Sequence, residues 1–345
     1  MNSQALGIDK TVLHIRIMKN NDHFIYIIDV YLPSSFVSFK VTYQRMDMAM
    51  KLNYHVVDVF TQIRFGGNPL AVVLDADELT TQQMQTVARE FNFSETSFVR
   101  APKHENNTAH VRIFTPNSEM DFAGHPNVGT SYVLANIANG SPQKLVFEER
   151  VGLVQVNVTY SENGDVQTTA ITSPMPLSKG AEYSPIDAAI ALSLDVEDVK
   201  TENHAPQHIS VGANFLVVEL ASRKALKDLR LNEYAARAMV GEGDAKAIYA
   251  YTRDVENELD WSARMYTFRG APYEDPATGS AGGAMATFAH DLGIKPLNGE
   301  FYNVTQGVDM GRPSSMQLKM HETDNGEIVE IAGSCVNVMR GVLEV

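Results

Sequence analysis

Hydrophobic and polar positions follow one another in short runs over most of the chain, which predicts many strands and few helices. Residues 56–60 and 70–74 are apolar runs joined by a turn rich in Gly, Asn and Pro at residues 66–69. Thr80 then precedes a helix and has Gln83 three residues later, as in a capping box. The apolar residues of that helix recur on one face: Met84, Val87, Ala88 and Phe91.

The next segments predict two further strands and a second helix. Residues 93–99 are strand-like and carry one acid, Glu95, between two phenylalanines. Residues 110–115 predict another strand. Residues 119–126 form a turn containing Gly, His and Pro that leads into a helix expected over residues 127–138.

The second half of the chain repeats this order of elements. Three pairs of segments match in sequence: residues 65–73 with 209–218, residues 112–115 with 264–267, and Gly124-His125 with Gly279-Ser280. Asn68 corresponds to Asn214 in this match, and the spacing from each asparagine to the next helix differs only by the length of a loop. The pattern therefore predicts an internal duplication of a strand-rich unit around a central helix.

The first fifty residues do not follow this pattern, although residues 12–17 and 24–31 read as two short strands. We therefore predict three parts. Residues 1–50 are an extension, residues 51–168 a first domain and residues 169–345 a second domain, whose last strand could pack on the first.

Residues 274–284 carry the densest set of chemically distinctive residues. They combine two acids, a proline, two hydroxyls and three glycines before a run of small residues. A turn that opens into a helix presents free backbone N–H groups and the positive end of the helix dipole, which together hold an anion such as a carboxylate. The alternative is a tight turn into a closely packed helix, with glycines needed only for packing. Two matched helix starts suggest a shared cleft between the domains.

Composition narrows the functional classes. The 345 residues are 44% hydrophobic and 20% charged, as in a globular protein that buries a sizeable core. A net charge of −14 argues against nucleic acid as a partner. Cys335 is the only cysteine, and the histidines show no ligand spacing, so we predict neither a disulfide nor a metal site. No apolar run is long enough to span a bilayer, and we expect a cytoplasmic protein without membrane contact.

Three residues are candidate proton carriers. Glu95 lies in a largely uncharged strand, where burial would raise its pKa and suit it to proton transfer; the alternative is a glutamate at the rim of the sheet. His125 follows a glycine at a helix start, where the dipole favours a neutral imidazole; it could equally cap the helix. Asp275 is the third candidate, and the alternative is a turn or cap residue. Ser280 would hydrogen-bond substrate or simply cap its helix.

These residues belong to a set of motifs that resembles the phenazine-biosynthesis PhzF-like family. The resemblance covers the chain from about residue 54 to the C-terminus and leaves out the first fifty residues. The motifs are residues 58–60, 67–73, 94–96, 121–126, 275–280, 306–307 and 310–314.

The resemblance implies an α+β fold of the diaminopimelate-epimerase type. It has two pseudo-symmetric domains, each a barrel-like, mostly antiparallel sheet around a central helix. It also implies a homodimer and an isomerisation that needs neither cofactor nor metal. The proton-carrying glutamate of the family's phenazine enzyme falls on Glu95. The family's histidine, aspartate and serine positions fall on His125, Asp275 and Ser280. The residues expected to bind a small carboxylate substrate are Asn68, Gly124, Gly279 and Ser280.

Three functions remain open from the sequence. The first is an isomerase in which Glu95 moves a proton on a small, cyclic, unsaturated carboxylate. The second is a stereoinverting epimerase or racemase, whose two-thiol form would need a cysteine at each helix start, where this chain has His125 and Ser280. The third is a relative that binds a small ligand without turnover.

Overall fold

The computed structural model describes most of the chain and divides it into two compact units, residues 1–50 with 344–345 and residues 51–343. The described residues are 4–8, 11–20, 23–32, 35–44, 50–138, 140–173, 175–240, 247–256, 259–268, 272–323 and 326–345. In the first unit, four antiparallel strands pair in chain order: β1 (Gln4–Ile8), β2 (Thr11–Asn20), β3 (His23–Leu32) and β4 (Ser35–Gln44). The two strands predicted here lie within β2 and β3.

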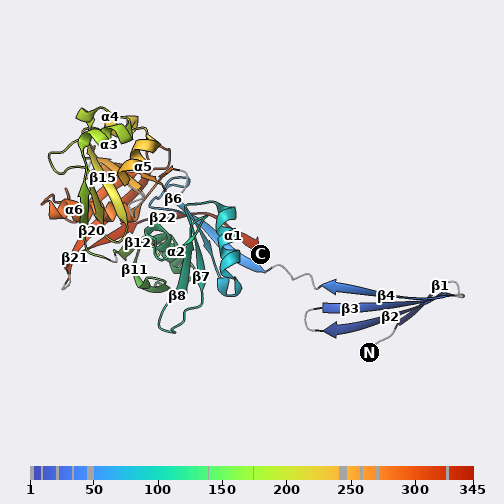
Figure 1. The fold of residues 1–345 in the computed structure, drawn as a ribbon. Helices are drawn as coiled ribbons and strands as arrows, with labels where there is room; N and C mark the ends of the chain where they lie inside the picture. The colour runs from blue at the N-terminus through green and yellow to red at the C-terminus, as the bar shows by residue number, and fades with distance from the viewer. Residues whose placement is uncertain are drawn as a thin grey trace. The chain divides into compact units, whose positions relative to one another are not determined.

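The second unit contains two halves (Figure 1), which share a common order of elements; the second half has further elements at its beginning and its end. The first half comprises β5 (Lys51–Val59), β6 (Asn68–Val73), η1 (Ala76–Glu78), α1 (Thr81–Phe91), β7 (Glu95–Arg100), β8 (Ala109–Phe114), β9 (Glu119–Met120), α2 (Gly124–Ile137), β10 (Lys144–Glu149), β11 (Gly152–Tyr160) and β12 (Val166–Thr172). The second half comprises β13 (Ser178–Glu182), α3 (Pro185–Leu192), η2 (Val196–Asp198), β14 (Gln207–Ser210), β15 (Asn214–Leu220), α4 (Arg223–Asp228), α5 (Glu233–Val240), β16 (Ala247–Thr252), β17 (Trp261–Thr267), β18 (Tyr273–Asp275), α6 (Gly279–Asp291), β19 (Tyr302–Gln306), β20 (Ser314–Thr323), β21 (Gly326–Gly333) and β22 (Cys335–Glu344).

Strand pairing confirms the predicted duplication. In the first half, β6 pairs antiparallel with β5 and parallel with β7, and β8 pairs antiparallel with β7 and β9 and parallel with β10. In the second half, β15 and β17 make the same pairings with β14, β16, β18 and β19. Each half ends in a meander, β10–β11–β12 or β19–β20–β21. The fold is therefore α+β with two pseudo-symmetric, mostly antiparallel domains, as predicted.

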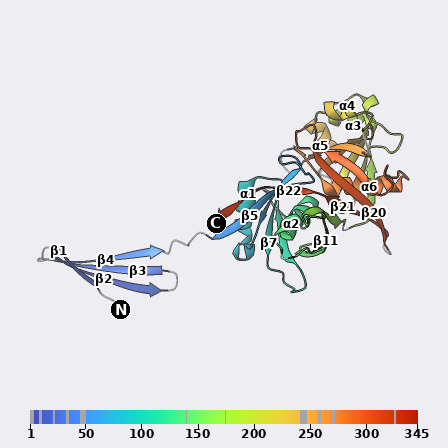
Figure 2. The same cartoon turned by 180° about the vertical axis from the view of Figure 1, so that it is seen from behind.

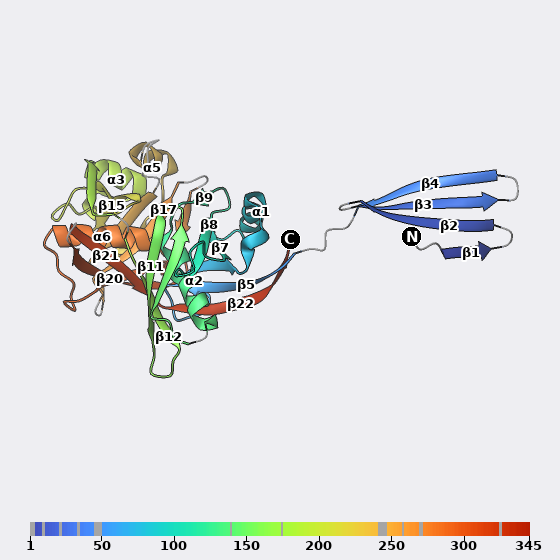
Figure 3. The ribbon, with the colours of Figure 1, turned by 90° about the horizontal axis from the view of Figure 1, so that it is seen from below.

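The two halves share one continuous sheet. Strand β12 of the first half pairs antiparallel with β21 of the second, from Thr169 opposite Gly333 to Thr172 opposite Glu330. The final strand β22 lies beside β5 in the sheet order, and Figure 3 shows the two running together. The division at residue 168 remains a prediction.

In each half the sheet packs around one central helix made largely of small, buried residues. Helix α2 contacts β5, β6, β11 and β12, and α6 contacts β14, β15, β20 and β21. A Cβ added to Gly129 would lie 2.6 Å from Leu70, and one added to Gly283 would lie 3.0 Å from Ile331. Close packing therefore requires glycine at these two positions.

Helix α1 forms for the local reason that the sequence predicted. The Thr80 hydroxyl accepts a hydrogen bond from the Gln83 amide and the Gln83 side chain accepts one from the Thr80 amide, which completes the capping box of α1. Ser184 caps α3. Helices α3, α4 and α5 gather on the second half (Figure 2). Helix α2 begins at Gly124, three residues before the predicted start.

The repeat extends to side chains. Arg112 makes a two-pronged ion pair with Glu119 at 2.7 and 2.8 Å and lies over the Phe114 ring. At the equivalent place in the second half, Arg264 pairs with Glu274 at 2.8 Å through two nitrogens and lies over Tyr266. These pairs define residue equivalence between the halves independently of the sequence match.

One detail of the predicted match is wrong by one residue. Leu70 of β6 and Phe215 of β15 both face the core of their own half, and their neighbours alternate in step. Asn68 therefore corresponds to Ala213, and Pro69 corresponds to Asn214. Gly67 and Gly212 align under this register, which the shorter β14–β15 turn obscures in sequence.

No helix among the described residues is long and apolar enough to cross a membrane.

Candidate active site

A large cavity lies where the two halves meet within residues 51–343. Its volume is about 1740 Å³, and both helix starts line it. Of the predicted site residues, the lining includes Glu95, Gly124, His125, Asp275, Gly279 and Ser280. The fold thus brings together residues from positions 95 to 280 of the chain.

The starts of α2 and α6 lie side by side at the wall of this cavity. A Cβ built on Gly124 would lie 3.7 Å from the Ser280 amide nitrogen and 4.0 Å from the Gly279 Cα. At Gly279 a Cβ would lie 3.2 Å from Phe60 and Ile331, so packing by itself calls for glycine there. Gly124 meets only ordinary contacts, so packing does not account for that glycine. Because the two helix starts lie close together at the cavity, their first N–H groups could bind the same anion.

Glu95 and His125 are in contact at the cavity wall. Glu95 is the first residue of β7, and its Oε2 lies 3.4 Å from Nδ1 of His125. The side chains are 15% and 6% exposed, respectively. Burial lowers the pKa of His125 to about 3, against a hydrogen bond to the Pro69 backbone that raises it. The imidazole is therefore neutral at pH 7, and its buried Nε2 has no hydrogen-bond partner among the described residues.

Asp275 provides the second carboxyl group of the site. It is the last residue of β18, just before α6, and it is buried. Its Oδ1 accepts a hydrogen bond from Asn68 at 2.9 Å, and its Oδ2 accepts one from the Thr278 hydroxyl. Burial raises the pKa of Asp275 to about 6, although these two hydrogen bonds lower it. Asp275 is therefore mostly ionised at neutral pH but close to its titration.

Asn68 lies behind Asp275 rather than at the cavity surface. It is fully buried, and its amide nitrogen also donates to the Ala277 carbonyl at 2.9 Å. Its amide oxygen accepts a hydrogen bond from Ser94 at 3.0 Å. Asn68 does not line the cavity. The structure thus places this predicted substrate ligand as a positioning residue for Asp275, because its hydrogen-bonding groups are already used.

Gln306 and Thr278 support the turn before α6, a role that the sequence did not indicate. The Gln306 amide nitrogen donates to the Asp275 carbonyl at 2.8 Å and to the Thr278 hydroxyl at 3.1 Å. Its oxygen accepts from the Thr278 amide at 3.2 Å. Gly307 follows with φ +75°, and a Cβ there would lie 2.4 Å from the Arg312 carbonyl oxygen. The only sign of this role in the sequence is that Gln306 and Gly307 form one of the motifs shared with the family.

The polar groups occupy one of two pseudo-equivalent half-sites. Equivalence by strand register sets four polar residues against apolar counterparts: Asn68 against Ala213, Glu95 against Ala247, Asp275 against Met120, and Thr278 against Ala123. The four apolar counterparts all line the cavity. One half-site therefore carries polar side chains at four positions where the other carries apolar ones. The second helix position is polar in both, with His125 in one half-site and Ser280 in the other.

The arginines near the cavity are already engaged or lie at its edge. Arg312 lines the cavity but donates to Asp58 at 2.7 Å and to the carbonyls of Gly66 and Gly67 at 2.8 Å. Arg89 lines it from the exposed side of α1. A single carboxylate would therefore rely on the helix-start amides for binding.

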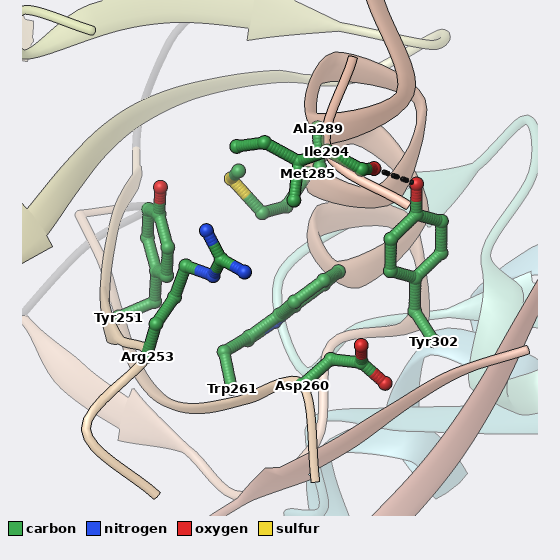
Figure 4. A pocket seen from close by; sticks show the side chains of 8 residues that line it. All are labelled: Tyr251, Arg253, Asp260, Trp261, Met285, Ala289, Ile294 and Tyr302. Carbon is green, nitrogen blue, oxygen red and sulfur yellow. Dashed lines mark hydrogen bonds between the residues drawn. The ribbon is translucent and has the colours of Figure 1, made fainter. Parts of the chain in front are cut away.

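A second hollow, shown in Figure 4, is part of the core. It lies between Tyr251, Trp261, Met285 and Tyr302, and its free volume is about 0 Å³. The Tyr302 hydroxyl donates to the Ile294 carbonyl at 2.5 Å, so its polar group is satisfied internally. This hollow has no room for a ligand.

Comparison with known proteins decides the family. The family model for phenazine biosynthesis-like proteins matches residues 57–341. This chain belongs to that family. It is 33% identical over 296 residues to trans-2,3-dihydro-3-hydroxyanthranilate isomerase of Pseudomonas fluorescens, covering 84% of this chain and 99% of the relative. It is 36% identical over 299 residues to an uncharacterized isomerase of Mesorhizobium japonicum, covering 84% and 98%. The chain is accordingly an isomerase.

Solved structures agree on the fold. A PhzF-family phenazine biosynthesis protein of Bacillus anthracis superposes with a TM-score of 0.74 at 24% identity, covering 86% of this chain and 100% of the other. A hydroxyproline epimerase of Agrobacterium vitis superposes with a TM-score of 0.55 at 12% identity, covering 88% and 94%. The architecture is therefore shared with racemases and epimerases.

Proposed function

We propose that this isomerase shifts a proton on a small, cyclic, unsaturated carboxylate, with Glu95 as its single acid and base. The observation that carries the proposal is the one-sided placement of the polar groups. Glu95, His125 and Asp275 lie in one half-site, while Ala247 and Met120 stand at the positions equivalent to Glu95 and Asp275. This arrangement provides proton carriers on one side of a bound molecule.

In the proposed step, the Glu95 carboxylate takes a proton from a carbon next to the substrate's double bond. The electron pair of that C–H bond forms a new double bond, and the electrons of the old one take the proton back from Glu95 at the far carbon. The molecular formula is unchanged, so the step requires no oxidant, reductant or cofactor. Glu95 takes the proton and gives the same proton back, which is a role that a carboxyl group at the cavity wall can perform.

The surrounding groups bind and orient the substrate. The N–H groups at Gly124 and Gly279 and the Ser280 side chain would hold the substrate carboxylate. Neutral His125 offers Nε2 to a substrate oxygen or nitrogen. Asp275, held by Asn68 and Thr278, would accept a hydrogen bond from a substrate hydroxyl or amine. These interactions orient the reacting carbons against Glu95.

Stereoinversion is a weaker candidate. Inverting a carbon through two thiols needs a cysteine at each helix start, and these places hold His125 and Ser280. The fold shared with racemases and epimerases therefore does not carry that activity to this chain.

The test uses trans-2,3-dihydro-3-hydroxyanthranilate, the substrate named for the Pseudomonas fluorescens relative. Enzyme and compound are incubated in deuterated water, and both product formation and deuterium content are followed by NMR and mass spectrometry. We expect wild type to form an isomer and Glu95→Gln to reduce the rate by at least about a hundredfold, as for loss of a general acid–base residue. Exposed Glu162→Gln is the matched control and should react as wild type does.

Equal rates for Glu95→Gln and wild type would exclude Glu95 as the base. Binding of the compound without conversion by wild type would indicate a different substrate or a ligand-binding relative. Product formed without deuterium remains consistent with the proposal, because a shielded carboxyl group can return the proton it took. We also propose a homodimer, which light scattering during gel filtration would test.

A further inference from the structure

The apolar half-site is a surface without an assigned role. Its residues come from the segment before α2 and from the beginnings of β15 and β16. Met120, Phe122 and Ala123 come from the first half, and Ala213 and Ala247 come from the second; all five line the cavity. At the equivalent positions the polar half-site carries Glu95, Asp275 and Thr278, with Asn68 behind Asp275. Phe122 corresponds to Ala277, and Ser280 is the polar counterpart of His125 on this side.

The apolar lining continues toward solvent along the β10–β11 turn. The Val151 amide donates to the Asp121 carbonyl at 3.3 Å, which ties this turn to the segment before α2. Val151 and Leu153 both line the cavity and remain exposed, Leu153 by 64%. Large apolar side chains left open in a cavity indicate contact with an apolar ligand group.

Size and charge indicate what that group would be. Ligand pockets typically enclose about 300–1,000 Å³, and this cavity of about 1740 Å³ exceeds that range. The helix starts offer room for one carboxylate, and Arg312 is already held by Asp58. Among the described lining residues, no unpaired cationic side chain lies next to Met120 or Leu153 in the chain. A second anionic group on the substrate would therefore lack a charge partner there.

We propose that the substrate is a monocarboxylate that bears an apolar hydrocarbon or aryl group, and that this group occupies the half-site formed by Met120, Phe122, Ala123, Ala213 and Ala247. The inference rests on the proposed function, because it takes the carboxylate to be bound between the helix starts. The proposal assigns selection of the substrate's apolar group to residues other than those proposed to transfer the proton.

The test measures binding of three unreactive acids by ligand-observed NMR or calorimetry: propanoate, 3-phenylpropanoate and succinate. We expect wild type to bind 3-phenylpropanoate at least tenfold more tightly than propanoate, and succinate no more tightly than propanoate. Leu153→Asp should reduce the preference for the phenyl group several-fold through loss of apolar contact and repulsion of the carboxylate. Leu297→Asp is the matched control, because Leu297 is 63% exposed and does not line the cavity.

Met120→Asp provides a second variant, since it restores at this half-site the residue type that its counterpart Asp275 has. It should lower affinity for 3-phenylpropanoate more than for propanoate. Equal binding of propanoate and 3-phenylpropanoate by wild type, or an equal effect of the Leu153 and Leu297 substitutions, would overturn the inference. These readouts involve no turnover. Failure of the apolar preference is therefore separate from failure of Glu95 as the base, which the deuterium experiment reports.

Discussion

Glu149 has a buried carboxyl group, and its replacement should stabilise the protein. It lies at the end of β10, in the position equivalent to Gln306 at the end of β19. Gln306 makes hydrogen bonds to the turn before α6. Both Glu149 carboxyl oxygens are buried and lack a partner with hydrogen-bond geometry among the described residues. Burial raises the pKa of Glu149 to about 8, although nearby Asn127 lowers it.

The magnitude follows from proton linkage. Below pH 4.5 Glu149 is protonated in both the folded and the unfolded chain, so its raised pKa does not lower the free energy of unfolding. Between pH 4.5 and 8 the unfolded chain ionises while the folded chain keeps its proton, so stability falls as pH rises. At about 1.36 kcal/mol per pH unit, the cost reaches about 3 kcal/mol at pH 7. We expect Glu149→Gln to increase the free energy of unfolding at pH 7 by up to that amount.

The assay is urea unfolding of the full chain at several pH values between 4.5 and 8.5. Fluorescence follows Trp261, the single tryptophan, which is buried in the second half. Circular dichroism reports both halves. The gain from Glu149→Gln should grow from near zero at pH 4.5 and level off above pH 8, with the dependence on urea unchanged.

The neighbouring Glu148→Gln is the control and should have the opposite effect. Burial by itself would raise the pKa of Glu148, but hydrogen bonds from Asn107, Lys103 and His104 outweigh it and lower that pKa to about 2. Its replacement should destabilise the fold at pH 7. A loss of stability in Glu149→Gln at pH 7, or a gain that does not vary with pH, would refute the reasoning.

Two further predictions concern the turn before α6. The rate of the isomerase should fall as pH drops through about 6, because burial raises the pKa of Asp275 to that value and protonation removes a hydrogen-bond acceptor. Asp275→Asn should be slower and should lack this acid limb; persistence of the limb in rate measurements on that variant would assign it elsewhere. Gly307→Ala should lower the free energy of unfolding by more than about 2 kcal/mol, because the added Cβ would lie 2.4 Å from the Arg312 carbonyl oxygen. Gly311→Ala, with a similar positive φ and open space, should cost only about 1 kcal/mol in the same unfolding assay.

Local sequence signals predicted the elements and their repetition. The Thr80–Gln83 capping box acts over three residues, and the apolar spacing of α1 acts over a few turns, so both can be read without the fold. The matched order of segments predicted two pseudo-symmetric domains and two helix starts facing one cavity. These predictions hold because each depends on neighbouring residues or on a repeated pattern.

Tertiary structure decided which residues meet and which carry the chemistry. Asn68 is hydrogen-bonded to Asp275, 207 residues later, and no local pattern specifies that contact. The register between halves sets Met120 against Asp275 and Glu149 against Gln306, and a one-residue shift would move each to the other face of its strand. The sequence by itself thus determined the elements, the duplication and the candidate acids. Burial and cross-domain contacts, which depend on the whole chain, determined that one half-site is polar and the other apolar.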